Sequence, residues 1–167
     1  MRSGRKRLVR LVLYGISVLS LLLAACGGMT VKVHDAVLHP GQDSEKTLLN
    51  GLGSSDPWVV EDAACGLGKV GSKASVEPLI TLLKNPQATP RMRQCAGSSL
   101  GLLGDPLAIE PMIRALENAG DPDERYGLVT GLGHFNDPRV KGVLEHLQKD
   151  NDVMVARAAK SALINMK

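Results

Sequence analysis

The chain has 167 residues, a formal net charge of +3 and only 2% aromatic residues, which favours one domain with a core of small and aliphatic side chains. Five of the 20 Lys and Arg residues lie in the first ten positions, so the other 15 stand against 17 Asp and Glu residues. The remainder of the chain is slightly acidic, and this argues against the broad basic face that nucleic-acid binding requires. No nucleic-acid partner is predicted.

The first 26 residues combine a basic start, the apolar run 11–23 and the sequence LAAC, which ends at Cys26. The run is shorter than the roughly 20 residues that span a membrane, but it is typical of a secretory signal. Together these regions resemble the bacterial lipoprotein signal, with residues 1–25 as the signal peptide. The resemblance implies cleavage before Cys26 and acylation of that cysteine. The alternative is an uncleaved anchor with an incidental cysteine.

Residues 26–44 are interpreted as the lipidated N-terminus and a flexible tether, because glycines and a proline interrupt them. The sequence VKVH at 31–34 alternates like a short strand, yet it has no obvious partner strand. His34, Asp35 and His39 could bind a metal ion. Isolated histidines near an anchor are more often solvated, so no metal site is predicted.

A repeat of about 32 residues fills the chain from residue 45 onward. Its first helix, here the A helix, opens with a capping residue and, in three of four copies, a proline at the first helical position. The copies begin at Asp56, Thr89, Asp121 and Asp152, and their aligned leucines are Leu67, Leu100, Leu132 and Leu163. The first three are expected to end at Gly71, Gly104 and Asn136, which accept the left-handed conformation after a helix.

A second, amphipathic helix, the B helix, follows in residues 75–84, 108–117 and 139–148, and a weaker copy occupies 45–52. Its apolar stripe consists of Val76, Ile80 and Leu83, then Ile109, Ile113 and Leu116, then Val140, Leu144 and Leu147. The sequence therefore predicts an all-α fold, an α-α superhelix of about 3.5–4 two-helix repeats over residues 45–167. The closing A helix has no following B helix, and its outer side could be frayed, covered by Arg157 and Lys160, or bound to a partner.

The stretch GLGKVG at 66–71 has the spacing of a dinucleotide-binding loop. Such a loop must follow a strand and open a helix, whereas here a predicted helix comes first. The glycines are therefore predicted to form a helix end and cap, with no cofactor. Gly68, Gly101 and Gly133 occupy one repeat position, where they would let paired helices approach closely.

The repeat pattern D-P-x-V-R-x-x-A-A-x-A-L-G-x-L-G, followed by A-x-x-P-L-I-x-x-L, resembles HEAT-like repeats of the phycobilisome-lyase type. Arg93 and Arg125 keep the arginine of this pattern, while Val60 and Ala156 replace it. Gly142 stands where the two preceding B helices carry Pro78 and Pro111. The resemblance implies an α-α solenoid fold but no single function, since such repeats serve many roles.

Candidate binding residues lie off the apolar stripe of the B helices. They are Glu77, Thr81, Lys84, Glu110, Arg114, Glu117, Lys141 and Glu145, together with Gln148. Pairs at i, i+4 such as Glu110–Arg114 and Lys141–Glu145 favour a solvated, self-paired face, and a protein-binding face is the alternative. Trp58, at the start of the first A helix, is either a binding anchor or a shield for the end of the stack. Tyr126 and Phe135 are predicted to be packing residues.

Cys65 and Cys95 lie in consecutive A helices. Two separate buried thiols are favoured over a disulfide, because neighbouring helix axes lie about 8–10 Å apart while a disulfide needs Cα atoms within about 7 Å. No nucleophile elbow or zinc-protease motif occurs, and no catalytic residue is predicted.

The favoured function is a non-catalytic, membrane-anchored scaffold that binds an unidentified protein of the bacterial cell envelope. Cys26 without a following Asp implies the outer membrane facing the periplasm, or the cell surface. A chromophore-lyase-like subunit is the alternative, although the family's lyases resemble intracellular proteins. A purely structural envelope component is a third possibility.

Overall fold

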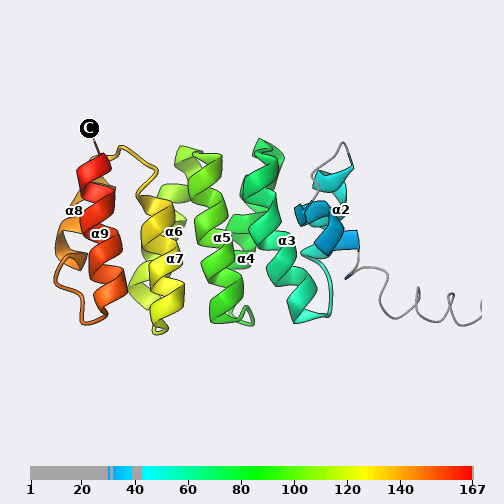
Figure 1. The fold of residues 1–167 in the computed structure, drawn as a ribbon, viewed down its shortest axis with the longest axis horizontal. Coiled ribbons are helices and arrows are strands. Elements are labelled where there is room, and N and C mark those ends of the chain that lie inside the picture. Colours follow the sequence, from blue (N-terminus) through cyan, green and yellow to red (C-terminus); the bar gives the residue numbers. More distant parts are fainter. Residues whose placement is uncertain (1–29, 31, 39–42, 167) are drawn as a thin grey trace, which may run out of the picture.

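The computed structural model describes residues 30, 32–38 and 43–166. Their helices form two rows, with no strand among these residues (Figure 1). The A helices are α3 (Pro57–Val70), α5 (Pro90–Leu103), α7 (Pro122–Leu132) and α9 (Val153–Asn165). The B helices are α2 (Ser44–Gly51), α4 (Val76–Lys84), α6 (Ile109–Asn118) and α8 (Pro138–Leu147). Short 3-10 turns, η1 (Lys73–Ser75) and η2 (Pro106–Ala108), lead into α4 and α6. The predicted HEAT-like α-α solenoid is confirmed.

Each A helix begins as the sequence predicts. The side chains of Asp56, Thr89, Asp121 and Asp152 accept hydrogen bonds from backbone N–H groups of the first turn. Proline follows at the first helical position of α3, α5 and α7, where its missing N–H removes no helical hydrogen bond. The starts of the A helices are therefore fixed by local sequence.

The GLGKVG stretch is the C-terminal end of α3, as predicted. Gly71 has φ +77°, in the left-handed region, and its N–H donates to the carbonyl of Leu67. Gly104 ends α5 in the same way, with φ +65°. The third copy differs, because α7 ends at Leu132 and Gly133 stays right-handed at φ −60°. Asn136 is thus not the cap of α7, and its expected role is wrong.

Small residues let the A helices approach until their backbones touch. A Cβ on Gly101 would lie 2.4 Å from the Cα of Gly131, and a Cβ on Gly68 would lie 2.7 Å from the Cα of Ser99. At the next interface, a Cβ on Gly133 would lie 2.7 Å from the Cβ of Ala162. The close approach predicted for the aligned glycines is confirmed, and the A row packs more tightly than the B row.

The core lies between the two rows. The apolar stripes of the B helices face it, and eight of their nine residues are buried, with Leu147 half-buried. Leu67, Leu100 and Leu132 of the A helices are fully buried. Because each helix pair exposes an apolar side that only its neighbour covers, the units are stable only as a stack.

The N-terminal segment departs from its expected form. Residues 32–38 are helical, not a strand or a flexible tether. Val33 is fully buried and Ala36 nearly so. A Cβ on Gly51 would lie 2.9 Å from the side chain of Val33, and one on Gly66 would lie 2.7 Å from that of Val37. These residues thus extend the stack by packing on α2 and α3.

The two cysteines also depart from the favoured interpretation. Cys65 and Cys95 form a disulfide between α3 and α5, with Cα atoms 4.6 Å apart. The prediction of two separate thiols is wrong because it assumed the usual spacing of helix axes. The glycine at position 68 and the small residues opposite it bring α3 and α5 closer than that spacing.

Candidate interaction surfaces

The predicted B-helix residues lie together on the outer side of the B row. Glu77, Thr81, Lys84, Glu110, Arg114, Glu117, Lys141 and Glu145 are all exposed, whereas Gln148 is half-buried. Arg114 donates to Glu110 at 2.9 Å, so this expected pair is present. In the described part of the chain Lys141 and Glu145 form no ion pair, contrary to the expectation.

Grooves separate neighbouring B helices. The groove between α2 and α4 has a volume of about 960 Å³ and includes Glu77, Thr81 and Lys84 in its lining. The groove between α4 and α6 measures about 380 Å³ and is lined in part by Lys84 and Arg114. The groove between α6 and α8 measures about 680 Å³, and Gly142 leaves its wall open where α4 and α6 carry proline. Parts of the predicted face therefore border hollows.

Trp58 does not join this face. It lies in the first turn of α3, in the A row, and its side chain is 73% exposed. A side chain with that exposure covers little of the stack, so the anchor interpretation fits its position better than the shield interpretation. The predicted binding residues thus fall on two different sides of the molecule.

The structure contains two ion pairs with buried carboxylates that the sequence did not predict. Arg93 on α5 donates to Glu124 on α7 at 2.6 Å, and Glu124 is 2% exposed. Arg125 on α7 pairs in the same way with Asp150, in the loop before α9. Arg93 and Arg125 hold the same position in their repeats, which was the available signal. Their acidic partners come from the following unit and cannot be assigned from spacing alone.

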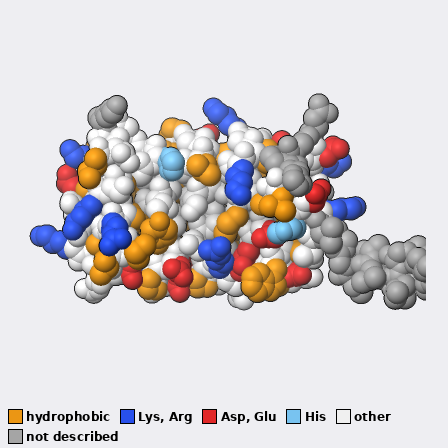
Figure 2. Space-filling view, viewed as in Figure 1, with side chains coloured by type: hydrophobic (Ala, Val, Ile, Leu, Met, Phe, Trp, Pro, Cys, Tyr) orange, Lys and Arg blue, Asp and Glu red, His pale blue; other side chains and the backbone are white. Residues whose placement is uncertain are grey.

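The A face has a different character (Figure 2). Acidic, basic and hydrophobic side chains are interspersed on it, and hydrophobic ones gather toward the lower edge of this view, where the A helices begin. The exposed apolar residues at these starts are Trp58, Val153 and Met154. Such a mixed surface suits a protein partner better than a polyanion.

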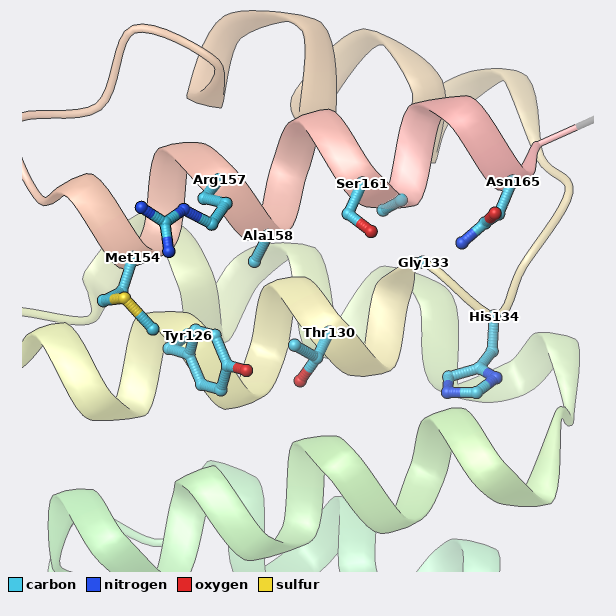
Figure 3. A pocket seen from close by; sticks show the side chains of 10 residues that line it. Tyr126, Thr130, Gly133, His134, Met154, Arg157, Ala158, Ser161 and Asn165 are labelled. Atoms are coloured by element: carbon cyan, nitrogen blue, oxygen red, sulfur yellow. The ribbon is translucent and has the colours of Figure 1, made fainter.

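A groove of about 410 Å³ lies on the A face between α7 and α9. Its polar lining consists of Tyr126, Thr130, His134, Arg157, Ser161 and Asn165. Figure 3 shows Tyr126, Met154 and Arg157 at one end, Thr130 and Ser161 in the middle, and His134 and Asn165 at the other end. Tyr126 is half-buried in this wall, whereas Phe135 is buried in the core as predicted.

One surface carboxylate has a strongly shifted pKa. Asp137 caps α8 and accepts hydrogen bonds from the side chain and the backbone N–H of Arg139, at 2.8–3.0 Å. These bonds favour the charged form and lower the pKa of Asp137 to about 2. The start of α8 therefore keeps its charged cap under acidic conditions.

The N-terminal residues considered as metal ligands do not form a metal site in the described part of the chain. The Nδ1 atom of His34 lies 3.4 Å from a carboxylate oxygen of Asp62 on α3. No cluster of three or more metal-binding side chains occurs among the residues that the structure describes. His39 and Cys26 lie outside those residues. None of the helices within the described ranges is long and apolar enough to cross a membrane.

A family of HEAT repeats matches residues 45–119. The match covers α2 to α6, and the later helices continue the same alternation of A and B helices. No curated protein matches the chain. HEAT repeats form extended surfaces for protein binding, which indicates a protein-interaction scaffold.

Proposed function

We propose that this chain is a lipid-anchored, non-catalytic scaffold that holds a protein partner at a bacterial envelope membrane. Cys26 carries the lipid, and the solenoid presents the binding surface. The outer membrane, facing the periplasm, is the proposed location in a Gram-negative cell.

The observation that carries the proposal is the contrast between core and surface positions of the repeat. Three of the four aligned leucines, Leu67, Leu100 and Leu132, are fully buried and Leu163 is half-buried, since packing requires the same shape in each unit. The second residue of the A helix is exposed in every copy and differs each time, as Trp58, Arg91, Asp123 and Met154. Dissimilar exposed side chains on a regular repeat backbone can each contact a different part of one partner, which is what a specific protein-binding surface requires.

The disulfide supports export of the domain. Structural disulfides persist in oxidising compartments such as the periplasm and are rare in the cytosol. The bond between Cys65 and Cys95 joins the first two full repeats. It agrees with the secretory character of the leader, because the two features come from separate parts of the chain.

The short distance to Cys26 supports a function at the membrane surface. Val33 is buried against the stack, so the chain from Cys26 to residue 32 spans at most about 20 Å even when fully extended. A lipid on Cys26 would therefore keep the first repeat close to the bilayer. Two or more acyl chains give stable anchoring, and tethering raises the effective concentration of a partner in the same membrane.

A two-part experiment in the native host tests the proposal. Metabolic labelling with an alkyne fatty acid should tag the wild-type chain and not Cys26→Ser. A photo-crosslinking amino acid at position 58 or 110 should then give one discrete adduct in the anchored protein, and a weaker one in Cys26→Ser. Gln87, exposed in the turn between α4 and α5, is the control position.

Two results would contradict the proposed function. The anchor is refuted if the wild-type chain remains unlabelled or fractionates away from membranes. The scaffold is refuted if positions 58 and 110 give no adduct, or give the same diffuse adducts as position 87.

A further inference from the structure

The groove between α7 and α9 contains an arginine with no protein partner. Arg93, Arg114, Arg125 and Arg139 each form an ion pair with a carboxylate. Arg91 donates to the side-chain oxygen of Gln94 at 2.6 Å. Among the described residues, Arg157 is the arginine for which neither an ion pair nor a side-chain hydrogen bond is present.

The charge of the groove is one-sided. Arg157 lines it, and none of the lining residues is Asp or Glu. Tyr126, Ser161, Asn165 and His134 add hydrogen-bonding groups around the same hollow. A guanidinium beside several neutral donors is complementary to a carboxylate, with which it forms short charge-assisted hydrogen bonds.

The shape of the groove favours a chain segment over a single small anion. Its lining extends along α9 from Met154 to Asn165, a length of about 16 Å at 1.5 Å per residue. That length accommodates about five residues of extended peptide. The small residues Gly133, Ala158 and Ala162 leave room for its backbone, and Ser161 and Asn165 can hydrogen-bond to it (Figure 3).

We propose that this groove binds an extended segment of the partner protein that carries an Asp or Glu side chain, with that carboxylate paired to Arg157. Met154, 51% exposed at the same end of the groove, offers an apolar contact for a neighbouring residue of the segment. The inference deepens the proposed scaffold function and rests on it. Peptide binding would also give a role to the groove between α7 and α9. The tighter interface between α5 and α7 has touching glycines in its place.

Peptide binding to the purified full chain tests the assignment. The probe is a fluorescein-labelled octapeptide of alternating Glu and Thr with an acetylated N-terminus and an amidated C-terminus. Its binding is measured by fluorescence anisotropy, with empty detergent micelles as the blank. The matched peptides replace Glu by Gln, with either an amidated or a free C-terminus. Only the Glu peptide should bind saturably.

Three variants locate the site. Arg157→Gln should weaken binding of the Glu peptide at least about 10-fold, since a charge-assisted hydrogen bond is lost. Ser161→Tyr should weaken it by filling the middle of the groove without changing charge. Lys160→Gln removes an exposed cation of α9 that does not line the groove, and should leave the affinity within about twofold.

Several outcomes would overturn the inference. The first is that the Glu peptide shows no saturable binding at concentrations up to about 1 mM, which would mean a dissociation constant weaker than that. The second is that the amidated Gln peptide binds as tightly as the Glu peptide. The third is that Arg157→Gln and wild type bind the Glu peptide with equal affinity. Binding of the free-terminus Gln peptide alone would instead assign the groove to a terminal carboxylate. If the peptide fails while crosslinks at positions 58 or 110 succeed, only this inference falls and the scaffold function stands.

Discussion

Arg93 on α5 donates two hydrogen bonds to Glu124 on α7, at 2.6 and 3.2 Å, across the boundary between two repeats. Its guanidinium also donates to the backbone carbonyl of Ala88 at 2.5 Å. The receiving carboxylate is only 2% exposed. The pair therefore ties two consecutive units together, and the buried Glu124 carboxylate depends on the half-buried Arg93 for a charged partner.

We expect Arg93→Ala to lower the free energy of unfolding by roughly 3 kcal/mol, because it leaves Glu124 buried without a partner. Urea denaturation followed by circular dichroism measures the change. The control is Arg114→Ala, which removes an exposed i, i+4 pair with Glu110 and should cost at most about 0.5 kcal/mol. Equal losses in the two variants would show that burial of Glu124 has no energetic consequence.

The touching glycines of α5 and α7 give a second prediction. In Gly101→Ala the new Cβ would meet the Gly131 backbone at 2.4 Å, so the helices must separate, at a cost of about 1–3 kcal/mol. Gly142→Ala is the matched control, since its Cβ would meet nothing within 4 Å on the exposed side of α8. That control should raise stability by about 0.5–1 kcal/mol. Thermal unfolding midpoints that move in the same direction for both would contradict the packing argument.

The disulfide gives a third prediction. Because Cys65 and Cys95 are 30 residues apart, their bond should contribute about 3 kcal/mol by restricting the unfolded chain. Dithiothreitol should therefore lower the urea midpoint of Cys26→Ser and leave a Cys26→Ser, Cys65→Ala, Cys95→Ala variant unchanged. Thiol titration of denatured, unreduced Cys26→Ser should detect no free thiol. Two free thiols would mean that the bond is absent from the protein as isolated.

The cap of α8 gives a prediction about pH. The pKa of Asp137 in the folded protein is about 2, against an ordinary value of 3.8, because Arg139 and the helix start favour its charged form. Since the folded pKa is the lower one, the stabilising contribution is present above the ordinary pKa and is lost as pH falls toward 2. Carbon NMR of the Asp137 carboxyl should place its titration near 2. The stability difference between wild type and Asp137→Asn should shrink over the same range, whereas a midpoint near 3.8 would refute the shift.

The sequence predicted the helices well because their signals are local. Asp56 caps α3 through its own side chain, and Gly71 ends it through its own backbone conformation. Leu67 and Leu100 recur at the repeat spacing because each faces the same core. Asn136 failed as a cap because α7 ends before reaching it, at Leu132.

The candidate surfaces were predicted less well because they depend on neighbouring units. Trp58 and Glu110 were both candidates for one binding face, yet they lie in different rows. The groove that contains Arg157 depends on how α7 and α9 pack against each other, and the sequence of either helix alone does not predict it. The burial of residues 32–38 depends on close contact with Gly51 and Gly66 in later helices. Their own sequence does not show this contact, so it indicated a tether.

The sequence by itself determined the repeat, the starts of the A helices and the buried stripe, since these follow from the periodicity and capping of contiguous residues. Only the tertiary structure decided how closely the A helices approach. That distance, set by glycines facing each other from different repeats, allows the Cys65–Cys95 bond and closes the A face between α5 and α7. It also leaves Arg157 facing an open groove, because distances between units depend on pairs of side chains far apart in the chain.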